Sequence, residues 1–226
     1  MKGGIIIKNI FFIITSVVLV IFVGFYFYNK STARVKVAII DTGINTKLSN
    51  FKNLHIEQKE NFRGSHGTGV MYLINKYAKS NRVKYYSFVL NKRTANEYAQ
   101  LINDAIDKNV DIINLSNGIF EDSKQVKTAI DKAKKNNIKV FAAAGNSFGT
   151  KMDYPAQYES VTSVGSLNEY GEISAMNPSK KSDEYCLGDN LNVIDQKGNY
   201  YRVKGSSFAT AICTGKYINS IIKKEK

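Results

Sequence analysis

The feature that most constrains the fold of this chain is an alternation of short apolar, β-rich segments with amphipathic helical segments from residue 35 onward. Strands buried on both faces of a sheet read as continuous apolar runs, so the pattern predicts a mostly parallel central sheet with helices on both faces. The predicted fold class is therefore α/β in three layers. The predicted strands are residues 35–40, 83–89, 110–115, 139–144 and 161–164.

Two helices are predicted between these strands. Residues 94–108 place their apolar side chains on one helical face, and Thr94 and Glu97 have the spacing of a capping box. Residues 123–136 repeat this design and end at two asparagines before the next strand. Ligands of open α/β sheets bind beyond the carboxyl ends of the strands, so polar residues at those ends are candidates for function.

The N-terminal region differs from the rest in composition. Ile10–Tyr28 contains no charged residue, and as a helix it would span roughly 29 Å, close to the hydrocarbon thickness of a bilayer. A cleaved signal peptide and a buried core helix are the alternatives. The run is longer than a usual signal h-region and no small-x-small site follows it, which favours an uncleaved anchor. The predicted segments are a basic N-terminus at 1–8, a transmembrane helix at 9–29, a linker at 30–34, one domain at 35–222 and a basic tail at 223–226.

The chain is strongly basic, with a formal net charge of +13. Its lysines and arginines are scattered in short clusters, which is typical of a solvated surface, and attraction to anionic lipid headgroups is the alternative. No nucleic-acid-binding motif is present, so no nucleic-acid partner is expected. Lysines flank the apolar run on both sides and do not decide its orientation.

The two cysteines, Cys186 and Cys213, lie outside any CxxC or CxxH motif, which argues against metal binding. A disulfide and two buried free thiols both remain open, because sequence does not place the two sulfur atoms in bonding range.

Four motifs carry side chains suited to nucleophilic catalysis. Asp41 ends an apolar run in Asp-Thr-Gly, and His66 lies between glycines before a helical run. Ser207 lies at the start of a predicted C-terminal helix, and Asn146 follows a strand beside Gly145. Taken singly, each has an ordinary explanation: a turn Asp, a structural His, an N-cap Ser and a turn Asn.

Taken together and in this order, the motifs resemble those of the subtilisin-like serine proteases, peptidase family S8. The resemblance extends from residue 35 to residue 215 and implies a subtilisin-like fold. It rests on Asp41-Thr42-Gly43, His66-Gly67-Thr68, Asn114-Leu115-Ser116-Asn117-Gly118, Ala144-Gly145-Asn146, Tyr154-Pro155-Ala156 and Gly205-Ser206-Ser207-Phe208-Ala209.

The resemblance implies a serine-type endopeptidase that works through an acyl-enzyme. Ser207 would be the nucleophile, His66 the general base and acid, and Asp41 the residue that orients the imidazole. Asn146 would donate to the oxyanion together with the Ser207 backbone N–H. The implied substrate-binding residues are Leu115, Ser116, Asn117, Gly118, Ala144, Gly145 and Asp153.

Two positions need comment within this resemblance. Asp153 precedes Tyr154-Pro155, at the base of the primary specificity pocket in the family, where a carboxylate would pair with a substrate Lys or Arg; a solvent-facing loop Asp is the alternative. Ser206 replaces a Thr before the nucleophile, which leaves two adjacent serines. The stretch between His66 and residue 83 is too short and too poor in carboxylates for a calcium loop, so we expect no calcium at that site. No other metal and no cofactor is expected.

The sequence therefore predicts a membrane-tethered serine endopeptidase, with a peptide or protein as its partner and substrate, and exported peptides or leader sequences as the expected targets. We expect a single-pass membrane protein with its catalytic domain outside the cell, and a monomer, although nothing in the sequence fixes the oligomeric state. A catalytically inactive, subtilisin-like binding protein at the membrane surface is the alternative. A nucleotide-binding domain is disfavoured because no glycine-rich phosphate loop follows a strand.

Overall fold

The computed structural model describes residues 14–22 and 35–224. The chain divides into two units, residues 1–33 and 34–226. In the first unit residues 14–22 are helical, and none of the helices within the described residues is both long enough and apolar enough to cross a bilayer. The predicted anchor at 9–29 and linker at 30–34 extend outside the described residues, so the transmembrane segment stays a prediction.

A seven-stranded sheet forms the centre of the second unit. Its strand order is β2-β3-β1-β4-β5-β6-β7, and every neighbouring pair is parallel. Strand β1 lies inside the sheet between β3 and β4, and all of its residues except Lys36 are buried. The strands are β1 (Val35–Asp41), β2 (His55–Gln58), β3 (Val83–Val89), β4 (Ile112–Leu115), β5 (Lys139–Ala143), β6 (Thr162–Leu167) and β7 (Glu184–Leu187).

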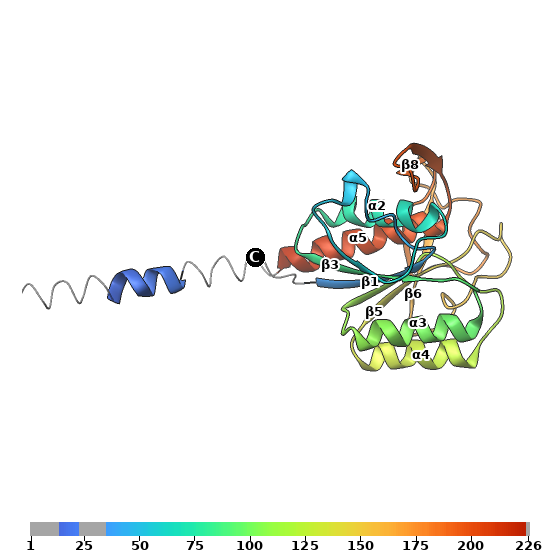
Figure 1. Ribbon diagram of the computed structural model, residues 1–226. Helices are drawn as coiled ribbons and strands as arrows, with labels where there is room; N and C mark the ends of the chain where they lie inside the picture. Colours follow the sequence, from blue (N-terminus) through green and yellow to red (C-terminus); the bar gives the residue numbers. More distant parts are fainter. Residues whose placement is uncertain (1–13, 23–34, 225–226) are drawn as a thin grey trace, which may run out of the picture. The chain divides into compact units, whose positions relative to one another are not determined.

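Helices cover both faces of this sheet (Figure 1), which confirms the predicted three-layer α/β fold. On one face α2 (His66–Ala78) packs against α5 (Ser206–Lys224), and on the other α3 (Ala95–Asp107) packs against α4 (Lys124–Lys135). Thr94 and Ser123 cap α3 and α4 by accepting backbone N–H bonds from Glu97 and Val126. These caps agree with the starts predicted from sequence.

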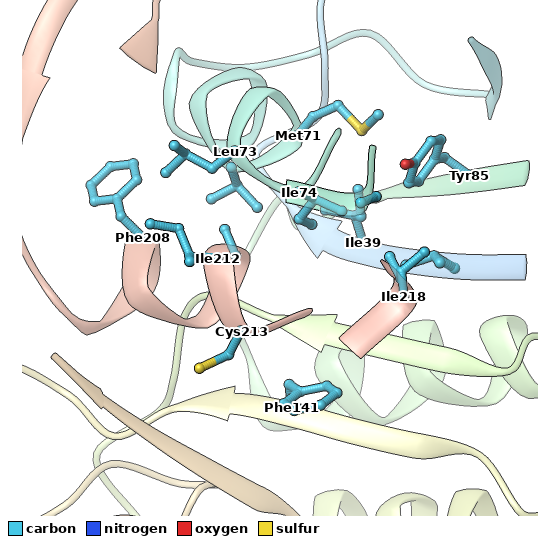
Figure 2. Packing of buried hydrophobic residues seen from close by; sticks show 14 of the residues in the cluster. Ile39, Met71, Leu73, Ile74, Tyr85, Phe141, Phe208, Ile212, Cys213 and Ile218 are labelled. Carbon is cyan, nitrogen blue, oxygen red and sulfur yellow. The ribbon is translucent and has the colours of Figure 1, made fainter. Parts of the chain in front are cut away.

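The larger core lies between the sheet and the α2–α5 layer. Figure 2 shows Met71 and Ile74 of α2, Ile212 and Ile218 of α5 and Ile39 of β1 converging there. At Gly215 the two helices approach so closely that a Cβ atom would lie 2.6 Å from the Ile74 carbonyl oxygen. This packing fixes the relative position of the α2 and α5 termini, from which two of the candidate catalytic residues project.

Several elements differ from the sequence prediction. The five predicted strands are present with ends that differ by at most three residues, and β3 has the predicted bounds, but β2, β7 and the antiparallel pair β8 (Leu191–Ile194) and β9 (Tyr200–Val203) were not predicted. Both β2 and β7 are short edge strands with partly exposed side chains, so they lack the continuous apolar signal of buried strands. Helix α5 continues to Lys224, two residues beyond the predicted domain end at 222.

The open question about the cysteines is answered by a Cys186–Cys213 disulfide, which joins edge strand β7 to α5. Its two Cα atoms lie 5.8 Å apart, a usual separation for a disulfide.

Candidate active site

The candidate residues meet at the carboxyl edge of the sheet. Asp41 is the last residue of β1, and His66 is the first residue of α2. Helix α2 can begin directly beside the loop after β1 because Gly67 has no side chain. A Cβ atom at this position would overlap the Gly43 carbonyl oxygen. The Gly67 backbone N–H also donates to Thr42 Oγ1 at 2.9 Å. The two glycine-containing motifs of the sequence thus bring a carboxylate and an imidazole together.

The Asp41 carboxylate and the His66 ring are in direct contact. His66 Nδ1 lies 2.8 Å from Asp41 Oδ1 and 3.0 Å from Oδ2. Asp41 is only 2% exposed, and its Oδ1 also accepts the Thr42 backbone N–H at 2.7 Å. The Asn117 side chain also favours the charged form of the carboxylate, and its Nδ2 donates to the Ile40 carbonyl oxygen at 2.8 Å. A buried carboxylate held this way can fix the tautomer of the imidazole.

Opposing effects set the pKa values of this pair. Burial alone would raise the pKa of Asp41, but the charge and hydrogen bond of His66, with the bonds from Thr42 and Asn117, lower it below its ordinary value. Burial alone would lower the pKa of His66, and the charge of Arg93 acts in the same direction. The Asp41 carboxylate outweighs both and raises the pKa of His66 above 6.5.

Ser207 enters the site on the first turn of α5. The ring of Phe208, the next residue, lies 5.2 Å from the His66 ring between centroids, and Ser116 Oγ donates to the Ser207 carbonyl oxygen at 2.8 Å. Within residues 35–224 no hydrogen bond joins the Ser207 hydroxyl to His66. Catalytic hydrogen bonds are often long without substrate and shorten when it binds.

The two adjacent serines have different environments. Ser206 is fully buried, its backbone N–H donates to Asn146 Oδ1 at 2.9 Å, and its hydroxyl accepts the Gly145 backbone N–H at 3.1 Å. Ser207 is half-buried, so its hydroxyl can reach solvent and substrate. The geometry therefore favours Ser207 over Ser206 as the reactive serine.

Asn146 follows β5 and is exposed at the same edge. Because its Oδ1 is bound by the Ser206 N–H, its Nδ2 is directed away from that bond and no described residue accepts from it. An amide held in this way is a preorganised donor for negative charge that develops on a bound carbonyl.

A buried chain of side-chain hydrogen bonds supports the start of α5. Thr214 Oγ1 donates to Asn114 Oδ1 at 2.9 Å, and Asn114 Nδ2 donates to Ser116 Oγ at 3.0 Å. Ser116 Oγ completes the chain by donating to the Ser207 carbonyl oxygen. This chain links the middle of α5 to the candidate nucleophile through β4.

Three of the predicted substrate-binding residues, Leu115, Ser116 and Ala144, have fully buried side chains, so only their backbone can face a substrate. Leu115 and Ala144 belong to the core beneath α3 and α4, and the Ser116 hydroxyl donates to the Ser207 carbonyl oxygen. Their role in substrate binding stays a prediction.

Asp153 lies between Gly118 and Gly145. A Cβ atom on Gly145 would lie 2.7 Å from Asp153 Oδ2, and one on Gly118 would lie 2.8 Å from Asp153 Cβ. Both glycines are therefore needed for the carboxylate to occupy this position. Burial raises the pKa of Asp153, and no ion pair or hydrogen bond to its carboxylate occurs within the described domain.

Sequence reasoning missed the supporting residues Asn117 and Tyr98. The predicted role of Asn117 was to line the cleft, but its side chain also holds Asp41. Tyr98 is fully buried and donates from its hydroxyl to the Asn117 carbonyl oxygen at 2.9 Å; its position on the apolar face of a helix gave no sign of this bond. His55 begins edge strand β2 and is exposed, outside the site. Among the described residues, no cluster of three or more His, Cys, Asp or Glu side chains could hold a metal ion.

Comparison with known proteins adds a family match. Residues 32–218 match the Subtilase family, Peptidase_S8. The chain is 31% identical over 209 residues to Subtilisin E of Bacillus subtilis (strain 168), covering 81% of this chain and 54% of the relative. It is 30% identical over 210 residues to Subtilisin of Bacillus pumilus, covering 81% and 75%. The chain thus spans about half the length of several curated relatives that it matches.

Solved structures share the fold at lower sequence identity. Prenylagaramide maturation protease PagA superposes with a TM-score of 0.77 at 21% identity, covering 86% of this chain and 78% of that one. A cold adapted subtilisin-like serine proteinase gives a TM-score of 0.74 at 21% identity, covering 85% and 78%. The arrangement of sheet and helices described above is therefore that of known protease structures.

The raised pKa of His66 gives a test of the site that needs no substrate. NMR titration of the ring protons should place the pKa of His66 above 6.5 in the wild-type protein. In Asp41→Asn it should fall below 6.5, because burial and the charge of Arg93 then act without the carboxylate. The chain has two histidines, so His55→Gln assigns the signals. Glu159→Gln removes one exposed negative charge as the control, and an equal shift in that variant would contradict the role of Asp41.

Proposed function

The chain belongs to the subtilase family, and on that premise we propose that it is a serine endopeptidase that cleaves peptide bonds through an acyl-enzyme on Ser207. The observation that carries the proposal is the His66 ring, which is hydrogen-bonded to the buried Asp41 carboxylate and lies 5.2 Å from the ring of Phe208, the residue after Ser207. No observation favours the inactive alternative.

In the proposed mechanism the Ser207 hydroxyl oxygen attacks the substrate carbonyl carbon while His66 Nε2 accepts the hydroxyl proton. The imidazolium that forms is stabilised by Asp41, whose carboxylate stays ionised because its pKa is lowered. His66 then gives the proton to the leaving amine as the C–N bond breaks. A water molecule, deprotonated in the same way, releases the acyl group and restores Ser207.

The negative charge that develops on the carbonyl oxygen needs donors. Asn146 Nδ2 and the Ser207 backbone N–H at the start of α5 are placed to supply them. Removing one such donor reduces turnover by ~10²–10³-fold in comparable sites. The bond from Ser206 N–H to Asn146 Oδ1 orients the amide before substrate arrives, so no reorganisation is needed during the reaction.

The proposed substrate preference is for Lys or Arg on the acyl side of the cleaved bond, the P1 position. Asp153 supports this preference, since its half-buried carboxylate lies between two glycines and has no cation partner among the described residues. A carboxylate left unpaired in a partly buried site is stabilised by a ligand cation that can reach it.

The proposed location of the enzyme is the membrane. Residues 9–29 would anchor the chain in the membrane in a single pass, with the catalytic domain outside the cell and exported peptides or leader sequences as substrates. The uncharged run Ile10–Tyr28 supports the anchor. The Cys186–Cys213 disulfide supports the outer side, because disulfides persist in oxidising compartments.

A fluorophosphonate probe separates an active enzyme from an inactive binding protein. We expect covalent labelling of the wild-type protein and complete loss of labelling in Ser207→Ala. Ser206→Ala is the matched control: it removes the bond to the Gly145 N–H, at a cost of about 1 kcal/mol in stability, but should still be labelled. Labelling that survives in Ser207→Ala and disappears in Ser206→Ala would show that Ser206, and not Ser207, is the nucleophile. Absence of labelling in the wild-type protein would favour the inactive alternative.

Peptides that differ only at P1 test the role of Asp153. The kcat/KM ratio of Arg to Leu substrates should fall by roughly 10- to 100-fold in Asp153→Asn, from the loss of a charged hydrogen bond of ~1.5–3 kcal/mol. Glu121→Gln, which neutralises an exposed carboxylate elsewhere on the domain, should leave the ratio unchanged. Equal turnover of Arg and Leu substrates by the wild-type enzyme would refute the proposed preference.

The orientation is tested on intact cells that produce the full chain. Added protease should degrade the domain at 35–222 while a cytoplasmic marker stays intact, and a thiol reagent should modify the two cysteines only after reduction. Protection of the domain until the cells are lysed, with both thiols reactive without reductant, would place it on the inner side.

A further inference from the structure

The edge of the sheet opposite the candidate active site contains a basic hollow of about 530 Å³. It lies where α2 ends, where β3 is about to begin and where α5 ends. Its lining contains three basic side chains and no carboxylate. The lining residues are Lys79, Ser80, Asn81, Arg82, Asn219, Ile222 and Lys223.

The packing of α2 on α5 builds this hollow. The close approach at Gly215 brings the carboxyl ends of the two helices to the same edge. Lys79 ends α2 in a left-handed conformation, with φ of 51°, and is exposed. Lys223 lies in the last turn of α5 and is also exposed. Two ammonium groups from helices far apart in the sequence therefore border one concave surface.

Lysines at helix carboxyl ends are common because they offset the helix dipole. That explanation accounts for Lys79 and Lys223 singly but not for a concave site whose described lining residues include no acidic side chain. Arg82 is already engaged in another interaction, whereas the two lysines form no ion pair within residues 35–224. The lysine ion pairs of the described domain are at positions 84, 108 and 127.

The path of the chain adds a second, independent observation. Strand β1 begins at this edge, where the Val35 N–H donates to the Arg82 carbonyl oxygen at 3.4 Å. Only seven peptide steps connect Tyr28, the last residue of the uncharged run, to Val35. Seven fully extended residues reach at most about 25 Å. If residues 9–29 span the bilayer as proposed, the basic hollow lies within reach of the lipid headgroups.

We propose that this hollow binds the phosphate of an anionic lipid headgroup, so that the basic edge of the domain docks on the membrane to which the chain is tethered. This inference rests on the proposed anchor. Lys79 and Lys223 supply the charge, and the Ser80, Asn81 and Asn219 side chains supply further hydrogen-bonding groups at the rim. Docking on this edge turns the opposite edge, with Asp41, His66 and Ser207, away from the bilayer.

The test uses the full chain in lipid nanodiscs made of phosphatidylcholine alone or with about 30% phosphatidylglycerol, a content chosen to resemble an anionic leaflet. Lysine acetylation is followed by mass spectrometry. Anionic lipid should slow the acetylation of Lys79 and Lys223 several-fold, and high salt should reverse the effect because the charges are then screened. Lys124 and Lys151 are the internal controls and should react at the same rate in both lipids. Lys124 begins α4 and Lys151 follows β5, so both lie toward the carboxyl edge of the sheet, opposite the hollow.

Variants supply the second measurement. Lys79→Glu/Lys223→Glu should abolish the lipid-dependent protection of neighbouring backbone amides against hydrogen exchange. Lys124→Glu/Lys151→Glu, with the same change in net charge, should retain it. Equal acetylation in both lipids, or equal protection of all four lysines, would overturn the proposal.

Failure of the anchor gives a different result from failure of the headgroup site. A chain that does not enter neutral nanodiscs lacks the proposed transmembrane segment. In that case the same acetylation assay on phosphatidylglycerol vesicles still decides whether the hollow binds anionic lipid.

Discussion

The buried charge of Asp41 is the constraint on which the arrangement of this domain depends. An ionised carboxylate that is 2% exposed is costly unless partners compensate for its lost hydration. Three different segments supply those partners: the Thr42 N–H after β1, His66 at the start of α2, and Asn117 after β4. The start of α2 is therefore tied to the end of β1, and Gly67 is the residue that allows them to approach.

Two adjacent residues after β4, Ser116 and Asn117, connect the remaining parts of the site. Asn117 holds Asp41 with its side chain and is itself held by Tyr98 through its carbonyl oxygen. Ser116, the preceding residue, faces the other side and binds Ser207. Two neighbouring residues of one strand end thus support the carboxylate and the nucleophile separately. The segment after β4 is the structural link between the two halves of the candidate mechanism.

The sequence was sufficient to predict the layers and, through the family resemblance, the contact between Asp41 and His66, but not the contacts that support the site. Buried strands such as β5 carry a continuous apolar signal, and the caps at Thr94 and Ser123 have local signatures. Edge strand β2 has neither, because one of its edges and part of its side chains face solvent. The disulfide, the buried side chain of Ser116 and the position of Asn117 near Asp41 depend on which residues face one another across the fold, and a motif does not encode this.

The hydrogen bonds from Thr214 through Asn114 and Ser116 to Ser207 all run in one direction. Every donor in the chain points toward the Ser207 carbonyl, so the dipoles add and each bond polarises the next. The direction of these hydrogen bonds depends on the side-chain amide of Asn114, which accepts from Thr214 through its oxygen and donates to Ser116 through its nitrogen. A carboxylate of the same shape at position 114 would present acceptors to both neighbours, the Ser116 hydroxyl would turn back toward it, and the first turn of α5 would lose its support. The Asn114 amide nitrogen therefore sets the direction of the hydrogen bonds that reach the candidate nucleophile, Ser207.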